Sequence, residues 1–265
     1  MKYIISELDK AQWEALHGEE ADKILLNNSN LLERDLEQNV DGCYLSIERV
    51  QSGISKFELW CTSGKYPQSI VEELKNAISQ AKAYICFTEL LGDFFLIQMD
   101  VNTYSKQILV ANNEWEWRVY ARHFYTILYE HQNSVNRMLN EILSQALDVF
   151  GKESALYQNL KSEKKSFVKL INDNSEYAKC IRVTTDAHYD GIFVDRKKKI
   201  ESMSYSKVVS LINNYLIKSA SLIHTILPLI QKKEDSLTGA MKSVIEAMES
   251  YLSSLSGKNN ITPRQ

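Results

Sequence analysis

The chain has few of the residues that interrupt regular structure. Its 265 residues include only three prolines and nine glycines. A fold of many short strands joined by tight turns needs far more of both, so this scarcity argues against one. It favours long uninterrupted elements, and we expect a mainly α-helical protein.

Cysteines and long apolar runs are also scarce. The four cysteines are scattered, with no CxxC pair and no histidine close to any of them, so we expect no zinc or other metal site. No stretch reaches about 18 uncharged apolar residues, and the charged N-terminus does not read as a signal peptide. P-loop, GxGxxG and GxSxG motifs are absent as well. These features predict a cytoplasmic protein without a membrane span or a bound cofactor.

Charge is distributed unevenly along the chain. The net charge is −3, but residues 1–150 carry −9, residues 151–235 carry +5 and residues 236–265 carry +1. An anionic partner would therefore meet the basic segment, 151–235. The alternative is that the acidic and basic halves attract each other, within one chain or across a dimer.

Apolar residues recur at three- and four-residue steps through most of the chain after Pro67. This spacing predicts helices over about 68–100, 114–150, 156–190 and 208–230. Gly151 and Gly191 follow the second and third of these at the position of a C-terminal cap, and Pro228 lies near the end of the fourth. Long amphipathic helices with short connections predict an antiparallel helical bundle over residues 67–235.

The two ends of the chain are expected to add smaller elements. Residues 42–61 are rich in β-branched and aromatic side chains, and apolar residues alternate on both sides of a Gln51-Ser52-Gly53 turn: Cys43, Leu45 and Ile47 before it, Phe57, Leu59 and Cys61 after it. We therefore expect residues 1–66 to form a small α+β segment with a β-hairpin near 43–61. Residues 236–265 are expected to add a short helix and a flexible tail.

One motif stands at the predicted end of the third helix. Arg182 and His188 lie in "RVTTDAH", which is followed by "YDG", a basic loop and a last long helix. In this order the chain resembles the HEPN superfamily over about residues 68–232. The resemblance implies a metal-independent endoribonuclease of a toxin–antitoxin or phage-defence system, with RNA as substrate and an antitoxin or other protein as possible partner.

The residue types suit the chemistry that the resemblance implies, in which the ribose 2′-hydroxyl attacks the adjacent phosphate. Histidine titrates near neutral pH, so His188 would exchange protons as acid and base. Arginine offers a permanently charged, planar set of donors, so Arg182 would hold the phosphate. Six residues at about 100° each place the two side chains about 120° apart on one helix. A complete site therefore predicts a homodimer that combines two such helices.

Other interpretations of the motif remain open. The chain contains a second match to the spacing, Arg118 to His123, within a predicted helix. Active HEPN proteins usually carry a polar residue directly after the arginine, where this chain has Val183. His188 also continues an apolar seam and could be a buried histidine. The alternative function is a catalytically inactive bundle that binds RNA or a protein partner.

Two basic runs lie in the positively charged segment. The first contains Lys164 and Lys165, and the second contains Arg196, Lys197, Lys198 and Lys199. We expect these side chains to contact RNA phosphates, which bind cations independently of base sequence. The alternative is that both runs are ordinary solvated surface.

Overall fold

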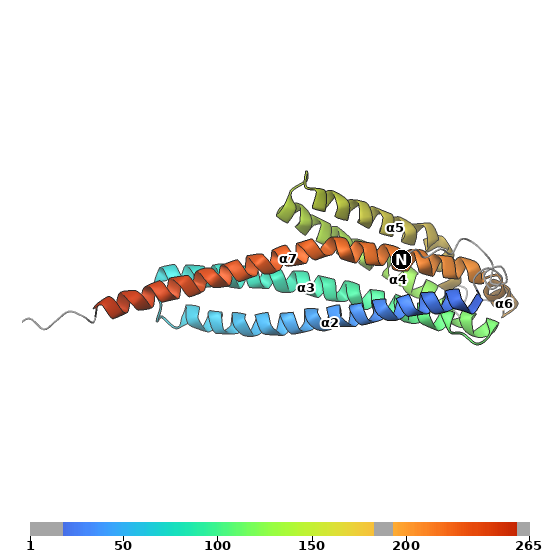
Figure 1. Cartoon of the computed structure of the whole chain (residues 1–265), viewed down its shortest axis with the longest axis horizontal. Coiled ribbons are helices and arrows are strands. Elements are labelled where there is room, and N and C mark those ends of the chain that lie inside the picture. The colour runs from blue at the N-terminus through green and yellow to red at the C-terminus, as the bar shows by residue number, and fades with distance from the viewer. Residues whose placement is uncertain (1–17, 183–192, 259–265) are drawn as a thin grey trace, which may run out of the picture. The chain divides into compact units, whose positions relative to one another are not determined.

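The computed structural model describes residues 18–182 and 193–258, and the regular structure within these ranges is entirely helical (Figure 1). The helices are α2 (Gly18–Thr62), α3 (Gln68–Leu109), α4 (Glu114–Phe150), α5 (Ala155–Arg182), α6 (Phe193–Glu201) and α7 (Tyr205–Lys258). The prediction of a mainly helical bundle is confirmed. Over the same residues, no helix has the length and apolar character needed to cross a membrane.

The chain divides into two compact units. Unit 1 comprises Met1–Val40 and Asp93–Leu227, and unit 2 comprises Asp41–Gly92 and Pro228–Gln265. Helices α2, α3 and α7 contribute residues to both units, whereas α4, α5 and α6 belong to unit 1 alone.

The predicted β-hairpin is wrong, because residues 43–61 lie inside α2. Within unit 2, Val50 and Ile54 are buried in a cluster that also contains Ala81, Tyr84, Ile85 and Leu237, with Ile47 packed against it. Positions 47, 50, 54 and 57 follow a three-and-four spacing, so they form one helical face. Leu45 and Leu59, which the hairpin would have buried, are exposed. Packing between helices outweighs the strand propensity of the β-branched and aromatic residues.

Two helices extend beyond their predicted ends near residues 100 and 230. Helix α3 runs through Gly92 to Leu109, and α7 runs through Pro228 to Lys258. Pro228 has no backbone N–H, so the helical hydrogen bond to the carbonyl of His224 is missing at that point. The helix nevertheless continues, so residues 236–258 belong to α7 and do not form the separate short helix that the sequence predicted.

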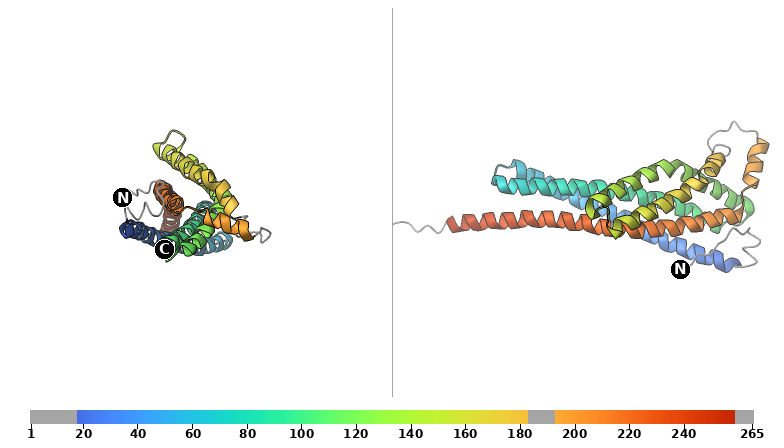
Figure 2. Two further views of the ribbon diagram at one scale, coloured as in Figure 1. Left: turned by 90° about the vertical axis from the view of Figure 1, so that its right-hand side faces the viewer. Right: turned by 90° about the horizontal axis from the view of Figure 1, so that it is seen from above.

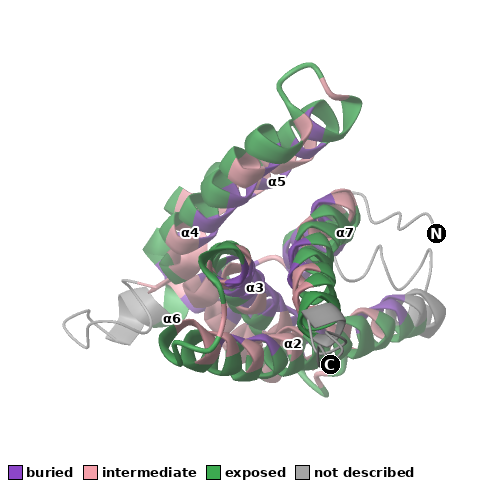
Figure 3. Cartoon of the chain, turned by 90° about the vertical axis from the view of Figure 1, so that its left-hand side faces the viewer, coloured by how far each residue is buried: buried purple, intermediate pink, exposed green. Residues whose placement is uncertain are grey.

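Helices α4 and α5 form an antiparallel hairpin in unit 1 (Figure 2). Asn113 caps α4, because its side-chain oxygen accepts a hydrogen bond of 2.9 Å from the Glu116 N–H. Gly151 ends α4 at a φ of 78°, in the region that favours glycine, as the sequence predicted. Both helices bury one stripe and expose the other face (Figure 3), and the buried stripes contain Phe124, Leu128, Ile142, Leu160, Phe167, Ile171 and Ile181. The hairpin thus fixes which α5 side chains point toward α4.

Candidate nucleic-acid interface

Arg182 is the last residue of α5, and α4 holds its side chain. The Nε atom donates a hydrogen bond of 2.9 Å to Oε1 of Glu130, and the guanidinium carbon lies 5.5 Å from the centre of the Tyr129 ring. Two consecutive α4 residues therefore fix the plane of the guanidinium. The side chain is 31 % exposed, and the Glu130 hydrogen bond uses only its Nε atom.

His188, the second residue of the predicted pair, lies outside the described residues, as does Val183. Within the described chain, the group that meets Arg182 is the Glu130 carboxylate, from a residue 52 positions earlier in the sequence. The predicted pairing of Arg182 with His188 therefore stays a prediction.

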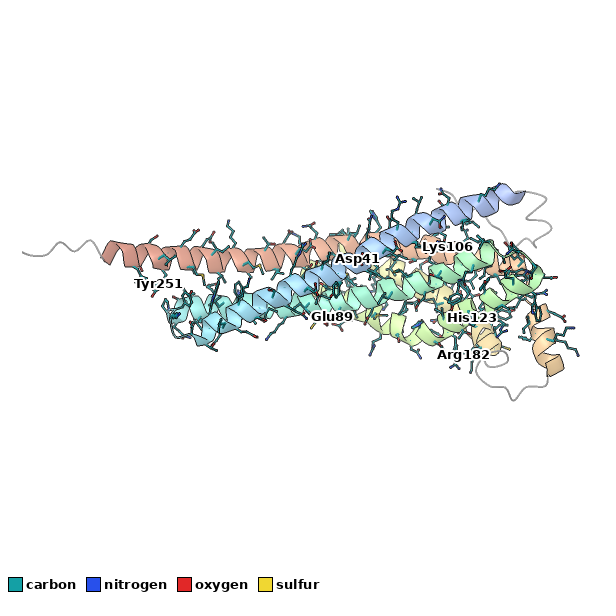
Figure 4. All side chains as sticks on the ribbon, turned by 90° about the horizontal axis from the view of Figure 1, so that it is seen from below. Asp41, Glu89, Lys106, His123, Arg182 and Tyr251 are labelled. Atoms are coloured by element: carbon teal, nitrogen blue, oxygen red, sulfur yellow. The ribbon has the colours of Figure 1, made fainter. Side chains whose placement is uncertain are left out.

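The second match to the motif, Arg118 and His123 on α4, is engaged elsewhere. Arg118 pairs with Glu114 at 2.7 Å and donates to the Glu201 carbonyl at 3.2 Å, and its side chain is only 12 % exposed. His123 stacks on Tyr104 with 5.4 Å between ring centres, and Figure 4 labels it together with Arg182. The two side chains have different packing partners. We therefore infer that this second match stabilises the fold and does not form a site.

The second basic run lies in α6, which packs against α4 and reaches α5 through Lys199. Lys199 Nζ lies 5.4 Å from the centre of the Tyr177 ring, and Tyr177 meets Tyr125 of α4 edge to face at 5.0 Å. Burial raises the pKa of Tyr125 well above its ordinary value, so this contact is between neutral phenols. Helices α5 and α6 are therefore held together on either side of the segment that contains His188.

The other residues of this run have fewer described contacts with the rest of the fold. Lys197 lies 3.6 Å from Glu201 of the same helix, and Lys198 is exposed. Arg196 belongs to α6, but its side chain is outside the described part. Among the described side chains of this run, Lys199 therefore contacts the α4–α5 hairpin.

Lys164 and Lys165 of the first run line a groove between α4 and α5, which we call the lysine groove. Its volume is about 510 Å³, and its lining is Asn136, Leu143, Lys161, Lys164, Lys165, Val168, Lys169, Asn172 and Asp173. Four lysines from α5 thus form one wall, and Asn136 and Leu143 from α4 form the other. Asp173 is the single carboxylate in this lining.

The positive charge of the lysine groove is not neutralised by the described residues. Lys164 Nζ donates to the neutral side chain of Asn140, and none of the four lysines forms an ion pair with a described carboxylate. Burial lowers the pKa of Lys164, because removing an ammonium group from water disfavours its charged form. A hydrogen bond of 2.8 Å from Gln132 to Asn172 joins the two helices at the Asp173 end. This arrangement of lysines suits a ligand that carries several negative charges in a row.

Sequence reasoning missed part of this interface. Lys161 opens the first basic run, 161–165, and Lys169 continues the face of Lys161 and Lys165 at four-residue steps. The role of Lys169 becomes meaningful only once α4 supplies the opposite wall. Glu130 and Tyr129 carry no signal in the sequence, because their contact with Arg182 depends on how α4 and α5 align.

No protein-family model matches the chain, and neither curated proteins nor solved structures show a significant match. No group of three or more histidine, cysteine, aspartate or glutamate side chains that could hold a metal ion occurs in the described part of the chain. The candidate site in the described part of the chain is therefore made of Arg182 and the lysine groove.

Proposed function

We propose that the chain is a HEPN-like, metal-independent endoribonuclease that acts as a homodimer. The observation that carries the proposal is the partly exposed Arg182, held by Glu130 and Tyr129 on the hairpin that also carries the lysine groove. A phosphate-binding arginine benefits from a fixed plane, and these two contacts hold the guanidinium through its Nε atom and its face. The resemblance of the motif supplies the rest: a cytoplasmic toxin–antitoxin or phage-defence protein, with an antitoxin or other protein as partner.

In the proposed reaction the RNA supplies its own nucleophile. The 2′-oxygen forms a bond to the adjacent phosphorus, the bond from phosphorus to the 5′-oxygen breaks, and a 2′,3′-cyclic phosphate and a 5′-hydroxyl result. His188 accepts the proton of the 2′-hydroxyl or donates one to the leaving 5′-oxygen, and the two histidines of a dimer provide one group for each step. Arg182 stabilises the charge that develops on the phosphate oxygens.

The second candidate function is RNA or protein binding without cleavage. The specific observation in its favour is that the lysine groove is complete without His188. Val183, which replaces the usual polar neighbour of the arginine, also fits an inactive site.

Cleavage of RNA in EDTA by the purified protein separates the two candidates. Alanine at Arg182 or at His188 is expected to lower the rate by about 100- to 10,000-fold. Alanine at His224, an exposed histidine of α7, is the matched control and should leave the rate unchanged. The cleaved RNA should carry 2′,3′-cyclic phosphates, and light scattering should give the mass of two chains.

Two outcomes would reject the ribonuclease proposal. Equal cleavage by wild type and both alanine variants would assign the activity to other residues or to a contaminant. RNA binding without cleavage under all conditions would establish the second candidate.

A further inference from the structure

We propose that the lysine groove binds the backbone of single-stranded RNA and leads the strand toward Arg182. The inference deepens the proposed function and rests on it for the cleavage step, whereas the binding step can be tested alone. It adds Lys161 and Lys169 to the RNA-binding residues and gives the substrate a minimum length.

The spacing of the lysines favours a regular polyanion. Lys161, Lys165 and Lys169 succeed one another at four-residue steps on α5, which corresponds to a rise of about 6 Å per step. A nucleic-acid strand repeats its charge every 3.4 Å when stacked and at larger intervals when extended. A row of evenly spaced cations in a groove can therefore follow successive phosphates, whereas an acidic patch on a folded protein has no such repeat.

The rest of the groove lining suits sugars and bases. Leu143 of α4 and Val168 of α5 give apolar contact, and Asn136 of α4 and Asn172 of α5 carry amide groups. Unpaired bases can use both kinds of contact, whereas the bases of a duplex are already paired and stacked. This favours single-stranded RNA over a duplex.

The position of the groove along α5 sets the substrate length. Lys165 precedes Arg182 by 17 residues of continuous helix, which spans about 26 Å. That span corresponds to roughly eight stacked nucleotides at about 3.4 Å each, and to about four nucleotides when the strand is extended to the spacing of about 6 Å between the lysines. A strand that engages both the groove and Arg182 must therefore extend several nucleotides beyond the phosphate that is cleaved.

The groove is tested by measuring how tightly the full chain binds labelled RNA. The chain carries His188→Ala so that it does not cleave the RNA, and binding is measured by fluorescence anisotropy at several salt concentrations. Glutamine at Lys161, Lys164, Lys165 and Lys169 together is expected to weaken binding of a mixed-sequence 20-nucleotide RNA at least tenfold. The slope of log affinity against log salt should fall by about 0.7 for each phosphate that the groove no longer neutralises. The matched control places glutamine at four exposed lysines of unit 2, Lys56, Lys65, Lys75 and Lys232, and it should bind like the parent. Circular dichroism checks that both quadruple variants fold.

The choice of ligand tests the chemistry. A 20-nucleotide single strand should bind much more tightly than a five-nucleotide strand or a 20-base-pair duplex, and the groove variant should lose this preference. Equal weakening by both quadruple variants would mean that net charge, not the groove, drives binding, and would overturn the inference. Groove-dependent binding to vesicles of anionic lipid, with no such dependence for RNA, would overturn it too.

Cleavage assays distinguish failure of this inference from failure of the proposed function. If the inference is correct, the groove variant with His188 restored cleaves the long RNA at least tenfold more slowly, and the unit 2 control variant cleaves it at the parent rate. Loss of groove-dependent binding alongside normal cleavage would reject the groove and leave the ribonuclease intact. Groove-dependent binding without any cleavage would reject the ribonuclease and leave the groove.

Discussion

Helices α2, α3 and α7 pair in two different ways in the two units. In unit 2 they form apolar clusters, such as the one that buries Ile70, Leu74, Ala77, Ala240 and Val244. In unit 1 they also bury polar pairs. Ser29 donates to Asn102 at 2.6 Å, and Ser219 donates to Gln98 at 2.7 Å.

The contrast shows how one set of helices obtains stability and register from different sources. Apolar contacts contribute free energy in proportion to buried area but tolerate small shifts. Buried polar pairs contribute less, yet a shifted register leaves their donors and acceptors unsatisfied. We therefore expect both units to respond to a loss of side-chain volume, and unit 1 to respond in addition to the removal of hydrogen-bond partners.

Loss of volume in unit 2 should have the largest effect. Leu74 is fully buried, and Leu74→Ala should lower the free energy of unfolding by about 2–5 kcal/mol, because it removes apolar contact and leaves a cavity. Urea unfolding followed by circular dichroism and by fluorescence, with Trp60 of unit 2 among the emitters, measures the change.

Leu59→Ala is the control for this change, because Leu59 is 67 % exposed on α2. It should alter the unfolding free energy by less than about 0.5 kcal/mol. A larger cost for Leu59 than for Leu74 would contradict the packing of unit 2.

Removal of one polar partner in unit 1 should have a smaller effect. Asn102 accepts from the Ser29 hydroxyl and donates to the Ser29 carbonyl at 2.9 Å. Asn102→Ala leaves both groups of Ser29 buried without this partner, so it should cost about 1–3 kcal/mol. Ser29→Ala in the Asn102→Ala background should cost less than it does alone, and a double-mutant cycle with additive effects would refute the pairing.

Alkaline pH should weaken unit 1 through a buried tyrosine. Tyr215 is 2 % exposed, and burial raises its pKa well above the ordinary value. A raised pKa in the folded state contributes stability that is complete below the unfolded pKa of about 10 and is lost as pH rises through the folded pKa. Each such tyrosine contributes up to about 1.4 kcal/mol per pH unit to the loss above pH 10.

Tyr215→Phe removes this ionisation, so the variant should lose stability less steeply than wild type between pH 10 and pH 11.5. Urea unfolding at fixed pH steps measures the two slopes. Identical slopes would show that Tyr215 reaches water in the folded chain.

The sequence predicted some parts of this fold well because the signals were local. The α4 and α5 seams were read from amphipathic spacing, and Gly151 from its position after the last apolar residue. Lys164 and Lys165 could be named as a basic run, but the groove depends on α4 side chains such as Leu143. The ion pair between Glu130 and Arg182 depends on helix alignment, which local periodicity does not determine.

The error over residues 43–61 has a physical cause. The segment satisfies two periods at once, alternation in its outer residues and three-and-four spacing at Ile47, Val50, Ile54 and Phe57. Only tertiary partners decide between them, and Ala81, Tyr84 and Leu237 provide a surface for the helical face. Gly53 then lies within a helix, where the sequence suggested a turn.

Gly53 therefore provides the smallest and most discriminating test. In α2 an added Cβ would meet the Met241 Cε at 3.9 Å, an ordinary contact, and the backbone has no positive φ that would oppose a side chain. Gly53→Ala should thus raise the free energy of unfolding by about 0.5–1 kcal/mol, since alanine loses less backbone entropy in a helix. At a hairpin turn that requires glycine, the same substitution would be destabilising. Gly64→Ala, at a φ of 68°, is the matched control and should destabilise. The two glycines lie in the same unit and receive the same methyl group. Opposite changes in the free energy of unfolding, measured with urea, would therefore reflect backbone conformation alone. A lower free energy of unfolding for Gly53→Ala would argue for the hairpin over the helix.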